Sequence, residues 1–183
     1  MTQAVAAFLK GVNVGGNKKI DMHGLRRAVA SVGCEEVRTH LQSGNVTFAC
    51  KEKNLGRLAA DIERAIQGEY GFTSRVILRD AKSLAAAIEA DPLAQTATNP
   101  SRHLIGFLAD SPASQAARAA EQMSTGKDLV SVVGKHLYMW CPDGISASPL
   151  FKVNFDRVLG TTVTMRNLNT VTKVAQMLDE IVI

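Results

Sequence analysis

The spacing of hydrophobic residues alternates along the chain between the two-residue period of a strand and the longer period of a helix. A hydrophobic run at 4–10 predicts a buried strand, and Asp21 is expected to cap a helix that Gly33 ends. Alternating segments around 43–45 predict a hairpin with a two-residue turn. The first half contains, in order, a strand at 4–10, a helix at 22–32, strands at 37–42 and 46–50, a helix from 54 to near Gly68, a strand at 74–80 and a helix that Asp80 caps and that runs to Ala90.

The second half repeats this order of elements. Pro112 is expected at the first position of a helix, and Gly134 with Lys135 at the turn of a second hairpin. The elements are a strand at 103–109, a helix opened by 110–112, strands at 128–133 and 136–141, a helix from Ser148 through Val158 with Gly160 as its stop, a strand at 161–165 and a helix that Asn167 or Asn169 caps and that ends near Glu180.

The repeated order predicts an α+β fold made by tandem duplication of a ferredoxin-like βαββαβ unit, each copy with an extra C-terminal helix. This prediction rests on the order of elements, because the residues of the two halves do not align convincingly. The copies are expected at residues 1–96 and 97–183, with the boundary in the polar segment 95–102.

Such a unit brings loops that are distant in sequence to one end of its sheet. In the first copy these are the loop 11–19 after the first strand and the turn 42–45. In the second copy, the loops 141–148 and 166–170 are expected to share the opposite end. We therefore expect two polar clusters.

Composition adds one localised feature. The 183 residues are 46% hydrophobic and 21% charged, which is typical of a folded globular protein. Residues 1–27 carry five basic side chains and one acidic side chain, so the formal net charge of +4 resides there, and residues 28–183 sum to zero. A local basic patch can attract phosphate or nucleic acid, although this charge is small for a dedicated nucleic-acid binder.

Several classes of protein lack support in the sequence. No stretch approaches the roughly 20 apolar residues that span a bilayer, and the amino end has no basic leader before a long apolar core. Cys34, Cys50 and Cys141 form no CxxC pair, and the four histidines have no metal-binding spacing. We therefore expect a cytoplasmic protein with reduced cysteines, no membrane contact, no metal and no cofactor. The sequence contains no catalytic constellation.

The opening loop combines glycine, asparagine and lysine directly after the first strand. Its glycines allow positive φ, so that a run of N–H groups can face an anion ahead of the positive end of a helix. A long turn with solvated lysines explains the same residues. The candidate ligand-binding residues of the first cluster are Lys10, Asn13, Gly15, Gly16, Lys18, Lys19, Gln42, Ser43, Gly44 and Asn45.

The second cluster contains the single tryptophan and an arginine at a strand-to-helix junction. An indole at a strand end is either a core residue or a platform on which a ligand stacks. The arginine can face an anion over the helix end, whereas an asparagine or threonine after it can simply cap the helix. The candidate ligand-binding residues here are Trp140, Arg166, Asn167, Asn169 and Thr170.

Four motifs together resemble the bacterial family known as domain of unknown function 1697. They are FLKGVNVGG at 8–16, QSGN at 42–45, WCPDGIS at 140–146 and RNLNT at 166–170. The resemblance extends over nearly the whole chain and implies a small cytosolic protein with a duplicated α+β arrangement and no assigned biochemical activity. Lys10 stands where arginine is common in the family and Leu168 where tryptophan is common, which weakens a bidentate anion contact and an aromatic stack at these positions.

Three functions are open at this point. Binding of a small anion, a nucleotide or a phosphorylated metabolite at the loop after the first strand is favoured, because a ligand explains polar motifs at loop ends more readily than packing does. A nucleic-acid-binding module is the second, although aromatic residues total only 5%. The third is a structural or interaction protein whose glycines shape turns. The ligand, any catalytic activity and the oligomeric state are left open.

Overall fold

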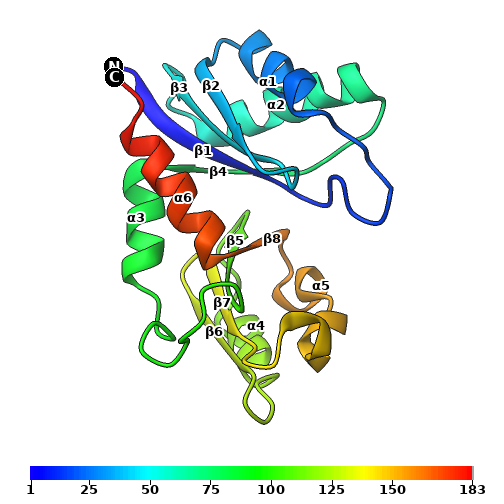
Figure 1. Ribbon diagram of the computed structural model, residues 1–183, viewed down its shortest axis with the longest axis vertical. Coiled ribbons are helices and arrows are strands. Elements are labelled where there is room, and N and C mark those ends of the chain that lie inside the picture. The colour runs from blue at the N-terminus through cyan, green and yellow to red at the C-terminus, as the bar shows by residue number, and fades with distance from the viewer. Residues whose placement is uncertain (183) are drawn as a thin grey trace. The chain divides into compact units, whose positions relative to one another are not determined.

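The structure, a computed structural model, describes residues 1–182 and contains two four-stranded antiparallel sheets and six α-helices over that range (Figure 1). The chain divides into two compact units. Unit 1 comprises Met1–Ala86 and the residues from Lys173 onward, and unit 2 comprises Ala87–Thr172. The division therefore falls inside two helices, whereas the sequence prediction placed it in the segment 95–102.

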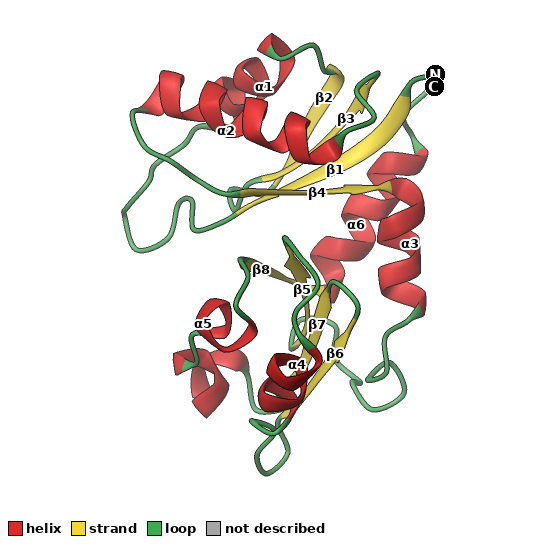
Figure 2. Ribbon diagram, turned by 180° about the vertical axis from the view of Figure 1, so that it is seen from behind, coloured by secondary structure: helices red, strands yellow, loops and turns green. Residues whose placement is uncertain are grey.

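Unit 1 begins with the basic N-terminal segment and contains the first sheet. Its strand order is β2-β3-β1-β4, and all neighbours are antiparallel. Figure 2 shows α1 and α2 on one face of this sheet, where Leu25, Ile62 and Phe48 are fully buried in a common core. The elements are β1 (Gln3–Leu9), α1 (Met22–Ser31), β2 (Glu35–His40), β3 (Asn45–Cys50), α2 (Leu55–Tyr70), β4 (Val76–Asp80) and α3 (Ala81–Glu89).

Unit 2 has the same order of elements and the corresponding strand order, β6-β7-β5-β8, again antiparallel throughout. Its core packs Leu108 and Leu137 of the sheet against Ala120 and Phe155 of two helices. The elements are β5 (His103–Leu108), α4 (Ser114–Glu121), β6 (Leu129–Val133), β7 (His136–Trp140), two short 3₁₀ helices (Ile145–Ala147 and Pro149–Lys152), α5 (Phe155–Leu159), β8 (Val163–Asn167) and the start of α6 (Leu168–Asp179), which belongs to unit 1 from Lys173 onward.

The element order predicted from the sequence is confirmed, but several boundaries differ. β2 and β8 lie at Glu35–His40 and Val163–Asn167 instead of 37–42 and 161–165. α2 runs past Gly68 to Tyr70 and ends at Gly71, whose φ of 73° is typical of a helix C-terminus. Pro112 lies before α4 rather than in its first turn, and Ala113 precedes the helix without a side-chain cap. The helix expected from Ser148 through Val158 is interrupted, because the Asn154 side chain accepts a hydrogen bond from Arg157 N and starts a new helix, α5.

Candidate functional site

The glycines of the opening loop form the tip of a small hairpin. Gly15 and Gly16 have φ values of 59° and 80° and lie between Val14 and Asn17, and Asn17 N donates to Val14 O at 3.1 Å. Two central residues with positive φ define a type I′ turn, which glycine adopts at little cost. The turn by itself therefore accounts for this glycine pair.

Asn13 joins the loop to the turn between β2 and β3. Its side-chain amide donates to Ile20 O at 2.9 Å and to Gln42 O at 2.7 Å, and its Oδ1 accepts from Ile20 N at 2.9 Å. Leu9 N also donates to Gly44 O at 2.9 Å. These bonds confirm that the loop 11–19 and the turn 42–45 lie together. They also satisfy the polar side-chain atoms of Asn13 with hydrogen bonds inside the fold.

The turn between β2 and β3 is longer than predicted. His40 pairs with Asn45, so four residues, 41–44, connect the strands instead of two. The amide of Asn45 is buried and donates to His40 O at 2.8 Å and to Ser43 Oγ at 3.0 Å, which holds the longer turn in place. A Cβ atom at Gly44 would lie 2.7 Å from Leu9 Cβ, so this position requires glycine for space as well as for its φ of 79°.

The N-cap of α1 is already an acidic group. Asp21 Oδ1 accepts from Gly24 N at 2.6 Å, and Asp21 Oδ2 accepts from Tyr70 Oη at 2.9 Å. The bond from Gly24 N, followed by the bond from Tyr70, lowers the pKa of Asp21 below its usual value. An external anion at this helix end would compete with a built-in carboxylate. The geometry therefore does not favour the helix start itself as the anion site.

The lysines of the first cluster differ in how strongly the fold holds them. Lys18 is exposed, with Nζ 2.7 Å from Thr73 O, and Lys19 is exposed as well. Lys10 is half-buried at the end of β1, and its carbonyl accepts from Ser74 Oγ at 2.9 Å. A ligand contact by these side chains stays a prediction.

The second cluster meets around the segment that enters β5. Cys141 N donates to Arg102 O at 3.2 Å, the Arg102 guanidinium donates to Pro142 O, and Asn169 Nδ2 lies 3.0 Å from Ser101 Oγ. Trp140 is 7% exposed within β7, as expected of a core residue. The loops predicted to lie together therefore do so, but the tryptophan is part of the packing.

Arg166 and its neighbours also have structural partners. The Arg166 guanidinium is buried and donates to Thr164 Oγ1 at 2.8 Å and to Met165 O at 2.9 Å. Burial lowers the pKa of Arg166 to about 10. Asn167 Oδ1 accepts from Thr170 N at 2.9 Å, so Asn167 rather than Asn169 caps α6. Ligand roles for the second cluster stay predictions that this geometry does not favour.

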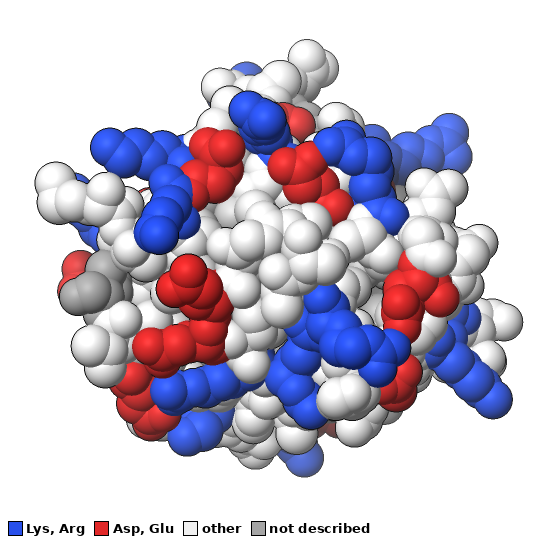
Figure 3. Space-filling view, turned by 90° about the horizontal axis from the view of Figure 1, so that it is seen from above, with Lys and Arg blue, Asp and Glu red and all other residues white. Residues whose placement is uncertain are grey.

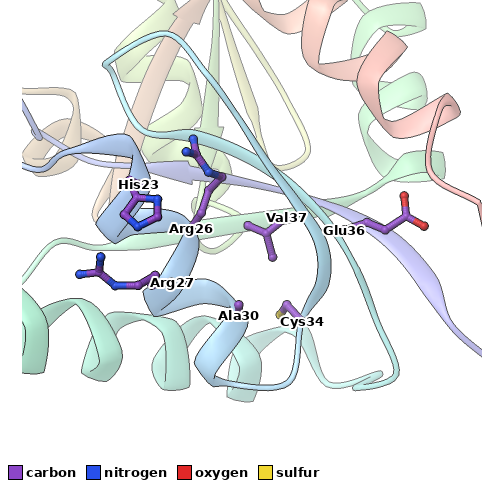
Figure 4. Close-up of a pocket in the computed structure, with 7 residues that line it drawn as sticks. All are labelled: His23, Arg26, Arg27, Ala30, Cys34, Glu36 and Val37. Carbon is purple, nitrogen blue, oxygen red and sulfur yellow. The ribbon is translucent and has the colours of Figure 1, made fainter.

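A cavity that the sequence reasoning missed lies between α1 and β2. Its volume is about 340 Å³, and it is open to solvent. Figure 4 shows the basic side chains grouped on the α1 side and Glu36 at the far end of the labelled group. We call this cavity the α1–β2 groove. Its lining residues are His23, Arg26, Arg27, Ala30, Cys34, Glu36 and Val37.

The periodicity of α1 explains why three basic residues gather there. His23, Arg26 and Arg27 have the i, i+3, i+4 spacing that places side chains on one helix face, while Leu25 and Val29 turn into the core. This spacing is the signal that could have revealed the groove. On the opposite side, a bulge between Glu35 and Arg38 shifts the register of β2.

The groove provides cationic hydrogen-bond donors but no reactive thiol. Arg26 Nη1 donates to Thr39 Oγ1 at 2.8 Å, and the guanidinium of Arg27 pairs with Glu69, which orients both side chains. Burial, together with a smaller effect of the nearby Cys50, raises the pKa of Cys34 to about 12. A protonated thiol is a poor nucleophile and a weak hydrogen-bonding group. The arrangement therefore favours binding of an anion over covalent chemistry.

The comparisons with known proteins agree with this fold. A family described as "Protein of unknown function (DUF1697)" matches residues 1–138. The chain belongs to this family. No curated protein matches the chain. Among solved structures, it is similar to "conserved bacterial protein SP0830 from Streptococcus pneumoniae", with a TM-score of 0.76 at 23% identity, over 97% of this chain and 99% of that chain. A likeness at this identity shows the fold alone.

The corresponding place in unit 2, between α4 and β6, is bridged by hydrogen bonds. Glu121 Oε1 accepts from Val132 N at 3.0 Å, and Ser124 Oγ accepts from Val130 N at 2.9 Å. Side chains at the end of α4 thus satisfy the outer N–H groups of this edge strand. The open groove of unit 1 is therefore not a necessary result of placing a helix beside an edge strand.

Other features of the described chain bear on binding. On the face that Figure 3 shows, basic and acidic side chains are interspersed and no extended basic surface forms. Among the helices of residues 1–182, none is both long and apolar enough to cross a bilayer. Within the same range, no three His, Cys, Asp or Glu side chains gather in a way that could hold a metal ion.

Proposed function

We propose that unit 1 binds a small phosphate-bearing anion, either a nucleotide or a phosphorylated metabolite, in the α1–β2 groove. The observation that carries this proposal is the alignment of His23, Arg26 and Arg27 along an open cavity of about 340 Å³. Arginine matches the geometry of phosphate oxygens through its planar fork of donors, and the volume lies within the usual range for small-molecule sites.

The site proposed in the groove differs from the site predicted at the loop 11–19. α1 follows this loop directly, so the basic residues of both segments belong to the part of the chain that carries the whole net charge. In this proposal, Lys18 and Lys19 attract the anion over a long range, and salt screens this attraction. The arginines of α1 supply the direct contacts.

The test is calorimetric titration of the intact protein with inorganic phosphate, nucleotides and sugar phosphates. Arg26→Gln combined with Arg27→Gln is expected to weaken binding at least tenfold, because each arginine provides charge-assisted hydrogen bonds. The control is Arg57→Gln combined with Arg64→Gln on α2, which makes the same change in net charge at exposed positions outside the groove. The control is expected to bind as the parent protein does.

Other outcomes would change the proposal. Absence of binding by the parent protein, or equal loss in both double variants, would contradict it. Binding of oligonucleotides alone, with an affinity that falls steeply with salt, would favour the nucleic-acid module instead. A stable protein that binds no anion would favour a structural or interaction role, in which the loop glycines only shape turns.

We also propose that each unit is a copy of a ferredoxin-like unit and that the protein works in the bacterial cytoplasm. The first proposal is supported by the shared element order and by strand orders in which the first and third strands of each unit are central. The second is supported by three buried free cysteines, which a reducing compartment preserves, and by the bacterial origin of the similar solved structure.

A further inference from the structure

The α1–β2 groove is divided into a basic part and an apolar part, and the carboxylate of Glu36 at its far end is paired with Arg38. His23, Arg26 and Arg27 form the basic part on α1. Next to them lie Ala30 of α1, Val37 of β2 and Cys34 between the two elements. A ligand that places its anionic group on the arginines therefore has its remainder over a floor of small apolar side chains.

This floor provides little for hydroxyl groups to bond. Ala30 and Val37 have no polar side-chain atoms, and the thiol of Cys34 is 5% exposed and belongs to the hydrophobic core of unit 1. A sugar hydroxyl that loses water over such a floor would lose hydrogen bonds without replacement. A flat ring would instead cover apolar surface and lose no hydrogen bonds.

We infer that the groove selects aryl phosphates, in which the aromatic ring is attached directly to the phosphate, over sugar phosphates of equal charge. The division of the lining residues into three basic and three small apolar side chains, with Glu36 paired to Arg38 at the far end, carries this inference. It rests on the proposed function, because the arginines must first bind the phosphate. A cavity of about 340 Å³ has room for one phosphate and one ring system.

The experiment compares phenyl phosphate, ribose 5-phosphate and inorganic phosphate by calorimetric titration of the full chain. Phenyl phosphate is expected to bind about tenfold more tightly than ribose 5-phosphate. This is the ratio expected when a ring removes roughly 60 Å² of apolar surface from water.

A near-isosteric change tests where the ring lies. Val37→Thr places a hydroxyl on the floor and is expected to reduce the advantage of phenyl phosphate over ribose 5-phosphate to about threefold. Val133→Thr makes the same change at an exposed position on β6 of unit 2 and is expected to leave the tenfold advantage intact. Thermal unfolding of both variants verifies that each is folded.

The results separate this inference from the proposed function. If ribose 5-phosphate binds as tightly as phenyl phosphate, the aromatic preference is wrong and anion binding by the groove stands. If Val37→Thr and Val133→Thr leave the same advantage, the ring lies elsewhere and the inference is also wrong. If no phosphate compound binds, both the proposed function and the inference fail.

Discussion

In unit 1, the helix beside the edge strand bonds to a strand side chain, Thr39, and leaves an open groove, whereas in unit 2 the helix bonds to the backbone of the strand. α1 and α4 follow the first strand of their units, and β2 and β6 are edge strands of sheets with corresponding strand order. Near its end α1 has Ala30, whose side chain has no acceptor, whereas α4 ends with Glu121, whose side chain accepts from Val132 N. The side chains on the facing helix thus decide whether the space is available to a ligand.

The comparison also separates polar residues that form turns from basic residues on the polar face of a helix. The glycines of the first cluster form turns, and the side-chain amides of Asn13 and Asn45 form hydrogen bonds within the fold. The basic residues on α1 lie on its polar face, away from the core. Four predictions test this comparison, from the largest expected effect to the smallest.

The hairpin turns of the two units should tolerate alanine very differently. Gly44→Ala is expected to destabilise the protein by about 3 kcal/mol, because a positive φ is combined with a Cβ that would lie 2.7 Å from Leu9 Cβ. Gly134→Ala in the turn of unit 2 is expected to cost about 1 kcal/mol, because its φ of 56° is positive but a Cβ there would meet nothing within 4 Å. Urea unfolding of both variants measures the difference. Equal losses would show that crowding at Gly44 is relieved by a small shift of the turn.

The hydrogen bonds that bridge α4 and β6 should contribute measurably to stability. Glu121→Ala is expected to cost about 1 kcal/mol, because it leaves the N–H of Val132 without its acceptor. Glu121→Gln keeps a carbonyl acceptor and is expected to recover most of this loss. Chemical unfolding and amide exchange at Val132 provide the measurement. Unchanged exchange in Glu121→Ala would contradict the bridging role.

The N-termini of α1 and α4 should also differ in how acid affects their contribution to stability. Hydrogen bonds from Gly24 N and Tyr70 lower the pKa of Asp21, so its stabilising effect is complete above the usual aspartate pKa of 3.8 and disappears as the pH falls through the lowered value. Asp21→Asn is expected to be less stable than the parent protein at pH 7 and to approach it below pH ~4. α4 has no side-chain cap at Ala113 and no such dependence is expected there. Urea unfolding across this pH range is the measurement, and a gap that stays constant would contradict the assignment.

The smallest effect is expected for the loop lysines. Lys18→Ala combined with Lys19→Ala should change stability by less than about 0.5 kcal/mol, because both side chains are exposed and the bond from Lys18 to Thr73 O lies at the surface. The same variant should weaken phosphate binding by about twofold at low salt and not at high salt. Loss of binding at both salt concentrations would place the anion at the loop instead of the α1–β2 groove.

The structure reveals a correspondence between the halves that the sequence did not show. Ala6 pairs with Arg79, and Ile105 pairs with Arg166, so the two buried arginines occupy matching positions on β4 and β8. Burial lowers the pKa of each to about 10. The residue after each arginine, Asp80 or Asn167, caps the next helix. Hydrophobic periodicity does not detect this match, because arginine is normally exposed.

The sequence alone determined the order of elements and the meeting of the loops, because these depend on local periodicity, on caps such as Asp21 and on turn residues such as Gly134. It also determined that the net charge lies in residues 1–27. Only the tertiary structure decided which polar residues already have partners within the fold. Whether Asn45 bonds to a turn, whether Trp140 packs in a core and whether Arg26 lines a cavity depends on residues distant in sequence. Local patterns carry no record of such partners, so the groove became visible only when α1 and β2 were placed together.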